Sequence, residues 1–267
     1  MSGDDRNPLS LASWSLHQMY DRGELDQLGM VRFAGEHGFS GFELGNRYFR
    51  APTQGYLREL TDVAESLDVR LLLIMCNDEG DVADPDRAER LQAARNHRKW
   101  IDVAAFLGCH SIRVNVAQAR PPEQADGARE AAAEALSDLL AYAAGEVRIV
   151  IENHGGLSSD PDWVVSLLEH VGDPGLGTLP DFGGFPPERR YEGVEKFMPY
   201  ASAVSAKCYD FGPAGEETTI DFARMIRLVR AAGYRGHIGV EYEGERLSER
   251  DGILAAKALL ERIQAGG

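Results

Sequence analysis

A carboxylate, an amide and an imidazole follow one another at the end of a strand-like segment, residues 148–154. The apolar run Ile149-Val150-Ile151 leads into Glu152, Asn153 and His154, and two glycines then let the backbone turn away. By the two-residue repeat of a strand, Val150, Glu152 and His154 share one face. Burying a carboxylate there is costly unless a cation pairs with it. The segment therefore predicts a cationic side chain or a metal ion beside Glu152, or, in a plainer interpretation, a solvated strand end.

Polar side chains also stand at the ends of other predicted strands, namely Glu43, Asn115, Asp181, Lys207, Glu241 and Glu243. In a barrel of parallel strands, all the carboxyl ends open at one mouth. Carboxylates that converge in a poorly hydrated cavity repel one another unless a cation neutralises them. Glu152, Asp181 and Glu241 are therefore candidate ligands of one divalent ion of the hard or borderline kind, such as Mn²⁺, Mg²⁺ or Co²⁺.

The remaining polar residues are candidates for substrate binding, and each also has a structural interpretation. Glu43 could pair with an arginine such as Arg113 instead of acting on a substrate. Asn115 could orient a loop or bind a sugar hydroxyl. His154 could contact the substrate, donate a hydrogen bond to a metal-binding side chain, or cap its own loop. Lys207 could bind a substrate oxygen or neutralise the acids in place of a metal.

The elements that must position these residues alternate between strands and helices. Apolar runs predict strands at 9–13, 41–45, 70–75, 111–116, 148–154, 175–180, 203–208 and 236–241. Helical periodicity predicts helices at 25–37, 53–67, 84–107, 122–144, 160–171, 191–199, 221–232 and 248–265, the third with Asp84 as its N-cap. Eight such pairs with short connections predict a (β/α)8 TIM barrel, and a doubly wound open sheet is the main rival.

The composition limits which binding partners and which cellular compartment we expect. The net charge of −15 argues against a nucleic acid or an anionic membrane surface. The apolar fraction of 43 % supports a large core, and no linker divides residues 1–267, so we expect one domain. The three cysteines are widely spaced, and no leader or membrane-spanning run is evident, which favours a reduced cytoplasmic protein.

Several of these segments together resemble the sugar phosphate isomerase/epimerase group of xylose isomerase-like TIM barrels. They are Ile151-Glu152-Asn153-His154, Asp181-Phe182-Gly183, Val240-Glu241-Tyr242-Glu243-Gly244, the opening Leu9-Ser10-Leu11-Ala12-Ser13-Trp14-Ser15-Leu16-His17 and the block Gly108-Cys109-His110-Ser111-Ile112-Arg113-Val114-Asn115. The resemblance covers essentially the whole chain. It implies a carbohydrate substrate and one divalent metal (Mn, Mg, Co or Zn) held by Glu152, Asp181, Glu241 and a histidine on the seventh strand. Ser205 stands where that histidine is expected, so His154 or a water would have to replace it.

The chemistry that the resemblance implies is removal of a proton next to a carbonyl, through an enediolate that the metal stabilises. Glu152 and Glu241 would form the acid/base pair, one removing the proton and the other returning it. The leading hypothesis is a sugar isomerase or epimerase, with a keto-sugar epimerase favoured. A lyase or dehydratase of a 3-keto-glycoside or inosose is the first alternative, and a metal-free sugar-binding or partner-subunit barrel is the second.

Further expectations concern the second-strand loop and two unlikely functions. Arg47, Tyr48 and Phe49 could cover the substrate or form a subunit contact in a homo-oligomer. Nucleic-acid processing would need a histidine-rich zinc cluster and a basic face, and this sequence has neither. No glycine-rich phosphate loop is evident, which favours an unphosphorylated substrate.

Overall fold

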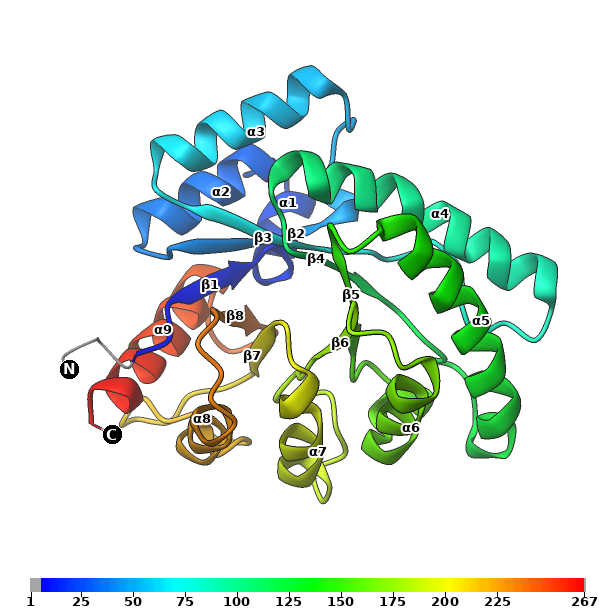
Figure 1. Ribbon diagram of the computed structural model, residues 1–267. Coiled ribbons are helices and arrows are strands. Elements are labelled where there is room, and N and C mark those ends of the chain that lie inside the picture. The colour runs from blue at the N-terminus through cyan, green and yellow to red at the C-terminus, as the bar shows by residue number, and fades with distance from the viewer. Residues whose placement is uncertain (1–5, 267) are drawn as a thin grey trace.

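The structure is a computed structural model that describes residues 6–266. Residues 1–5 and 267 lie outside it, and with them most of the N-terminal segment to which the expectation about a leader refers. The barrel described below spans the rest of the chain (Figure 1).

Eight strands run parallel in one curled sheet, in the neighbour order β6-β5-β4-β3-β2-β1-β8-β7. Because sequential strands are neighbours and each is followed by a helix, the sheet is the wall of a (β/α)8 barrel, which confirms the predicted fold. The strands are β1 (Leu9–Ala12), β2 (Gly41–Gly45), β3 (Arg70–Met75), β4 (Ser111–Val114), β5 (Arg148–Glu152), β6 (Leu176–Leu179), β7 (Val204–Cys208) and β8 (Ile238–Tyr242).

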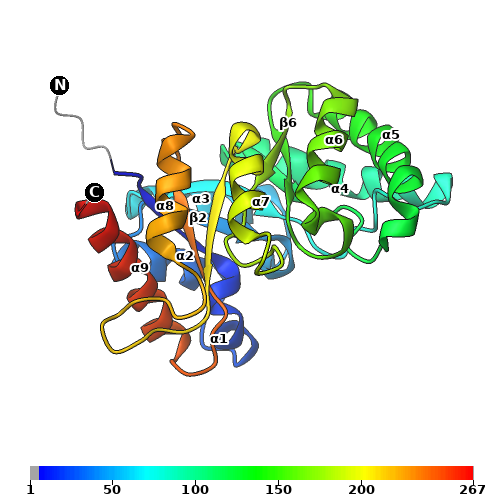
Figure 2. The ribbon, with the colours of Figure 1, turned by 90° about the horizontal axis from the view of Figure 1, so that it is seen from below.

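The helices form the outer layer around the strands, as both views show (Figures 1 and 2). The α-helices are α1 (His17–Asp21), α2 (Gln27–Glu36), α3 (Gln54–Ser66), α4 (Arg87–Leu107), α5 (Ala125–Ala143), α6 (Pro161–Val171), α7 (Arg190–Phe197), α8 (Phe222–Ala231) and α9 (Glu249–Ala265). Short 3-10 turns are η1 (Ser13–Leu16), η2 (Asn46–Tyr48), η3 (Pro122–Gln124), η4 (Gly156–Ser159) and η5 (Met198–Tyr200). Within residues 6–266, none of these helices has the length and hydrophobicity needed to traverse a lipid bilayer.

Side-chain caps explain where most helices begin. Asp160, for example, accepts a hydrogen bond from the Asp162 amide at the start of α6, and Ser248 does the same from Asp251 at the start of α9. The predicted N-cap at Asp84 is wrong, because Asp86 caps α4. The Asp84 carboxylate instead accepts from the Asp86 amide, and this local turn delays the helix.

The segment after β1 forms two short elements that the sequence pattern did not predict, η1 and α1. Five residues are too few for α1 to be stable by itself. Its free amides are satisfied from the far end of the chain, because the Glu249 carboxylate accepts from the Gln18 and Met19 amides at 2.8 Å each. Ser15 holds η1 to β8 by accepting from the Tyr242 amide at 2.9 Å.

The seam between β6 and β7 closes the barrel without a regular ladder among the described residues. Two isolated parallel bridges, Thr178 to Ala201 and Asp181 to Ser205, span it. The amide of Ser205 donates to the carbonyl of Pro180, and the amide of Phe182 donates to the carbonyl of Ser205, each at 3.0 Å. Asp181 is therefore placed by the same bonds that complete the barrel.

An apolar layer fills the middle of the barrel interior. It consists of Leu73, Met75, Val150, Leu179 and Ala203. Val150 faces this interior, whereas Ile149 and Ile151 pack in the outer core between strands and helices, as the strand period predicted. Met75 borders a cavity at the mouth and Leu73 borders one at the opposite end, so the layer separates two polar compartments.

The opposite end contains a cavity of about 170 Å³ around the carboxyl group of Glu43. Arg70, His110 and His237, which lie at the amino ends of β3, β4 and β8, also line it. Ser10 Oγ donates to Glu43 Oε1 at 2.7 Å, while Oε2 is buried without a hydrogen-bond partner. Burial raises the pKa of Glu43 to about 8, and the bond from Ser10 only partly offsets this. The group is therefore mostly protonated at neutral pH.

Replacing Glu43 by glutamine should stabilise the protein in alkaline solution. The folded state keeps this proton up to about pH 8, whereas an ordinary carboxyl releases it near 4.5. Stability of the wild type therefore falls as pH rises between these values, and Glu43→Gln avoids that loss. Urea unfolding at pH 8.5 should show a gain on the order of 2–5 kcal/mol, with little change at pH 5. The exposed control Glu146→Gln should show no such pH dependence, and an equal effect of Glu43→Gln at both pH values would contradict the assignment.

Candidate active site at the barrel mouth

Three buried acids from three strand ends form the centre of the site. Glu152 ends β5, Asp181 follows β6 and Glu241 belongs to β8. One carboxylate oxygen of each lies within 4.8 Å of the others. The three acids are far apart in the sequence, and they meet because parallel strands bring their carboxyl ends to one mouth.

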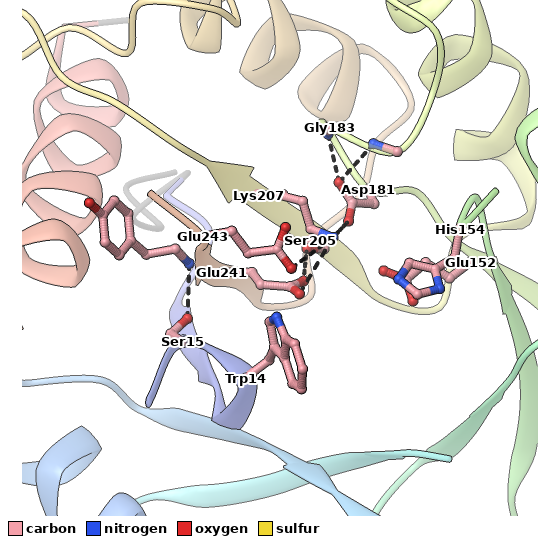
Figure 3. Close-up of polar contacts among 12 residues, drawn as sticks. Trp14, Ser15, Glu152, His154, Asp181, Gly183, Ser205, Lys207, Glu241 and Glu243 are labelled. Carbon is pink, nitrogen blue, oxygen red and sulfur yellow. Dashed lines mark hydrogen bonds and ion pairs between the residues drawn. The ribbon is translucent and has the colours of Figure 1, made fainter. Parts of the chain in front are cut away.

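Backbone bonds hold Asp181 in place. Its amide donates to Asn153 Oδ1 at 2.8 Å, and Asn153 Nδ2 donates to its carbonyl at 2.9 Å. The Gly183 and Gly184 amides donate to Oδ1 at 2.6 and 3.2 Å, and the contact of Gly183 can be followed in Figure 3. Any side chain at Gly184 would collide with the Asn153 carbonyl, since an added Cβ would lie 1.9 Å from that oxygen.

Lys207 on β7 supplies a cation to this acid cluster (Figure 3). Its Nζ lies 3.0 Å from Asp181 Oδ2 and 3.5 Å from Glu241 Oε1 and from Glu243 Oε1. Burial alone would lower the pKa of Lys207, but the surrounding carboxylates, Asp181 first, raise it above its ordinary value. The carboxylates therefore favour the charged ammonium form.

Arg113 on β4 performs the same role for Glu152. Its Nε lies 3.0 Å from Glu152 Oε2, and both side chains are almost completely buried. Nη1 donates to the Cys76 carbonyl at 3.0 Å, to Asn77 Oδ1 at 3.1 Å and to Asn115 Oδ1. Asn115 thus fixes the guanidinium from within the site.

Ser205 occupies the place where the resemblance puts a histidine ligand. Its Oγ donates to Glu241 Oε2 at 3.0 Å. Burial raises the pKa of Glu241, and Lys207 only partly offsets it. Burial likewise raises the pKa of Asp181 to about 6 despite Lys207. Both carboxylates therefore accept a proton more readily than exposed acids do.

A cavity of about 550 Å³ opens above the acids. Glu152, Glu241 and Arg113 form part of its floor, and His154 lies at its edge, where its Nδ1 contacts Gln118 Nε2. Desolvation, together with the charges of Arg113 and Lys207, lowers the pKa of His154 to about 4, so the imidazole is neutral. Lys207 and Asp181 lie below the lining.

One wall of the cavity is aromatic. The Trp14 ring stacks on His17, with ring centroids 4.6 Å apart. The Arg47 guanidinium lies 5.4 Å from the Trp14 centroid and 5.3 Å from the Tyr48 centroid, and it pairs with Asp21 at 3.1 Å. Trp14, Arg47 and Tyr48 all line the cavity. Phe49 instead packs against Tyr56 and Trp100 beside α3 and α4.

Most of the residues singled out from the sequence meet at this mouth. Those are Arg113, Asn115, Glu152, His154, Asp181, Lys207, Glu241 and Glu243. The expectation for Glu43 is wrong in position, because it lines the cavity at the other end of the barrel. It lies in the middle of β2, beside Gly239, whose missing side chain makes room for the carboxyl group. The suggested pair of Glu43 with Arg113 is also wrong, since Arg113 pairs with Glu152.

Sequence reasoning did not single out one group of lining residues. Trp14 follows β1, Asn77, Asp78 and Asp81 follow β3, and Gln118 follows β4. The signal that could have found them is their place directly after a strand, where barrel sites are built.

The donor set fits a divalent cation. Oε2 of Glu152 and Oδ2 of Asp181 are buried, and in the described part of the chain each meets one ion-pair partner at 3.0 Å, Arg113 Nε and Lys207 Nζ, so each keeps a lone pair for a metal ion. Three clustered carboxylates offer the hard oxygen ligands that Mg²⁺ and Mn²⁺ prefer. Lys207 and Arg113 compensate part of their charge but not all of it, because Glu243 adds a fourth acid.

Comparison with known proteins agrees with this architecture. The chain matches the family model described as xylose isomerase-like TIM barrel over residues 31–264. A search of curated proteins found no match.

Solved structures share the fold at low sequence identity. A D-tagatose 3-epimerase-like protein has a TM-score of 0.78 at 17 % identity, covering 97 % of each chain. A xylose isomerase-like TIM barrel protein from Mycobacterium smegmatis in complex with magnesium has 0.71 at 18 %, covering 99 % of each. A probable 3-DHS dehydratase from Bacillus anthracis has 0.73 at 17 %, covering 95 % of this chain and 98 % of its own. With a family model that matches most of its length, the chain belongs to the xylose isomerase-like TIM barrel family.

Proposed function

We propose that the protein is a divalent-metal-dependent isomerase or epimerase of a keto-sugar or a related carbonyl compound. The observation that carries this is the cluster of Glu152, Asp181 and Glu241, of which Glu152 and Glu241 line a cavity with polar and aromatic walls. Sugar epimerases and a dehydratase are among the proteins with the same fold.

Glu152 and Glu241 are the acid/base pair in this proposal. They project from β5 and β8, which lie on different sides of the barrel, so a substrate between them can meet one carboxylate on each face. One takes the proton from the carbon next to the carbonyl, and the other returns a proton to the opposite face, which is epimerisation. Burial raises the pKa of Glu241, which favours the protonated form that returns a proton to the substrate.

Glu152, Asp181 and Glu241 would hold the metal. When bound, it supplies positive charge where negative charge develops on the substrate oxygens. Asn115 and neutral His154 border the same space and can bind hydroxyl groups, while Arg113 orients Glu152. The positive charge of Lys207 reduces the repulsion between the carboxylates of Asp181 and Glu241, and it keeps both side chains ordered when no metal is bound.

Two alternatives remain distinct. Elimination of a leaving group, the reaction of a lyase or dehydratase, shares the first proton removal, and product analysis separates it from epimerisation. A metal-free sugar-binding barrel is favoured by one specific contact, the 3.0 Å pair of Lys207 with Asp181, in which an ammonium group takes a metal's place.

Proton exchange tests the proposed chemistry. In D₂O, the protein should replace the proton next to the carbonyl of a keto-sugar by deuterium, which proton NMR detects for D-allulose, D-tagatose and 3-keto-glucosides. Glu152→Gln and Glu241→Gln should each lower the exchange rate by about 10²-fold or more, the usual contribution of a general acid or base. The surface variant Glu130→Gln serves as control. Wild-type exchange rates in both variants would rule out the acid/base pair.

Metal content tests the proposed ligands independently of activity. We expect about one divalent ion per native chain by elemental analysis, following from one oxygen donor on each of three acids. The ion should be lost from the Glu152→Gln, Glu241→Gln double variant and kept by Glu43→Gln, which removes a buried acid at the other end. Native protein that stays metal-free in excess Mn²⁺ would contradict the metal-dependent proposal and leave Lys207 as the resident cation.

Removing the Lys207 charge tests its role in the acid cluster. Lys207→Met should destabilise the metal-free protein by about 3–5 kcal/mol, because buried acids lose their partner. Mn²⁺ should restore more stability to this variant than to the wild type, as followed by thermal unfolding. Lys257→Met, in a partly exposed pair with Glu261, should lose less than about 1 kcal/mol. If Mn²⁺ stabilised Lys207→Met and the wild type equally, the Lys207 ammonium group and the metal ion would not occupy the same site.

A further inference from the structure

The cavity at the amino ends of the strands, here called the basal cavity, has polar groups that the proposed reaction does not use. Its polar lining consists of Glu43, Arg70, His110, Ser202, Tyr234 and His237. The cavity measures about 170 Å³. At about 30 Å³ for each water molecule in the liquid, this is the space of five or six waters. The apolar layer inside the barrel separates it from the acids at the mouth.

Glu43 presents a hydrogen-bond donor to the basal cavity. The carboxyl group is mostly protonated at neutral pH, and its Oε1 accepts from Ser10 Oγ, so the proton is on Oε2. Oε2 is buried and has no hydrogen-bond partner within residues 6–266. A buried donor without an acceptor is unfavourable. The geometry therefore favours a ligand that offers lone pairs to this O–H group.

Ser202 provides a second donor on another side of the cavity. Its amide donates to the Thr178 carbonyl at 3.0 Å, which fixes the residue at the seam between β6 and β7. Its Oγ is buried and has no hydrogen-bond partner in the described part of the chain. The hydroxyl group is therefore available to a ligand in the cavity.

Arg70 gives the basal cavity a positive charge. Its side chain makes no hydrogen bond or ion pair with any other residue that the structure describes. Burial lowers the pKa of His237, and the charge of Arg70 lowers it further, so the guanidinium lies close to this imidazole. Arg148 lies nearby, where it donates to the Pro174 carbonyl at 2.8 Å and pairs with no carboxylate among the described residues. A chain of net charge −15 thus keeps uncompensated arginines at this end.

The two imidazoles of the lining are neutral and partly bonded. His110 Nδ1 lies 3.0 Å from Ser111 Oγ, and His237 Nε2 lies 3.2 Å from Ser40 Oγ. Burial lowers the pKa of His110 to about 4, and the charges of Arg70 and Arg148 contribute. The second ring nitrogen of each histidine has no protein partner within residues 6–266 and can bind a ligand directly or through water.

A metal ion does not fit this set of groups. Glu43 is the one acid among the described lining residues, and Arg70 repels cations. Glu43, His110 and His237 also lie too far apart to share one ion. Among the described residues, the one group of three such side chains with ligand atoms within 4.8 Å of one another is the cluster at the mouth.

We propose that the basal cavity binds a small free oxyanion of the size of sulfate or phosphate. Arg70 supplies the positive charge, and the hydroxyl groups of Glu43 and Ser202 donate to the anion's oxygens. A guanidinium group suits this ligand because its N–H groups match the spacing of oxyanion oxygens. The five heavy atoms of such an anion fit a space of five or six waters. This site is separate from the proposed reaction at the mouth and does not depend on it.

Calorimetric titration of the native protein with sulfate tests the site. Sulfate is the probe because, unlike a phosphate group, it does not titrate near neutral pH. We expect one site per chain with a Kd on the order of 1 mM. Arg70→Gln should weaken binding about tenfold or more, because charge-assisted hydrogen bonds are lost. Arg58→Gln, exposed on α3, is the matched control and should bind as the wild type does. No binding at tens of millimolar sulfate, or unchanged binding in Arg70→Gln, would overturn the proposal.

The proton on Glu43 makes the binding depend on pH. The anion binds the protonated form, so affinity for sulfate should fall as pH rises through about 8 and the carboxylate forms. Between pH 7 and pH 9 the expected loss is about tenfold, the change in the protonated fraction. Glu43→Gln keeps a neutral donor at this place and should bind sulfate equally well at both pH values.

Other groups that face Glu43 are the same in both proteins. They are Ser10, Arg70, His110, Tyr234 and His237 around the cavity, and Glu152 and Glu241 beyond the apolar layer, whose charges also raise the pKa of Glu43. A difference between wild type and Glu43→Gln therefore reports on Glu43 itself. The same pH dependence in both proteins, or loss of binding in Glu43→Gln at pH 7, would overturn the proposal.

Competition distinguishes a free anion from the phosphoryl group of a larger molecule. Inorganic phosphate should displace sulfate, whereas glucose 6-phosphate should not, because the cavity has no room for the sugar ring. Displacement by glucose 6-phosphate that Arg70→Gln abolishes would overturn the assignment to a free anion.

Discussion

The site depends on balancing negative charge in a space that water barely reaches. Asp181 and Glu241 are buried, and their mutual repulsion would open the mouth if Lys207 did not lie between them. Arg113 does the same for Glu152. Because β4 and β7 carry the cations while β5, β6 and β8 deliver the acids, the barrel wall must be complete before the charges meet. The site is therefore complete only when the barrel wall is closed.

Ser205, in place of the expected histidine, leaves the charge of the site unchanged but alters its hydrogen bonds. An imidazole ligand would be neutral, and so is the serine, but the shorter side chain donates a hydrogen bond to Glu241. Glu241 is thereby held from two sides, by Ser205 and Lys207. A metal at this site would have three carboxylate ligands from the protein, so more of its coordination positions are open to substrate oxygens and water.

The sequence predicted the fold and most of the site because both follow from local patterns. Apolar runs mark strands, and the acids that follow them mark the mouth. Glu43 was misplaced because a strand pattern says which face a side chain takes but not how deep in the barrel it lies, and that depends on Gly239 of another strand. The helix α1 was missed because Glu249, distant in sequence, supplies its caps. Gln118 and Asp81 lie in loops, where side chain direction has no periodic signal.

The closure between β6 and β7 links the stability of the barrel to the position of the acid cluster. Elsewhere strands share regular ladders, but within the described residues this seam is made by single bridges, one of them at Asp181. Local opening is cheapest where few backbone bonds must break. A fluctuation that parts this seam would displace Asp181 from Lys207 before the rest of the barrel loosened. Inactivation by heat or denaturant should therefore precede global unfolding, because the seam is the part of the barrel that opens first.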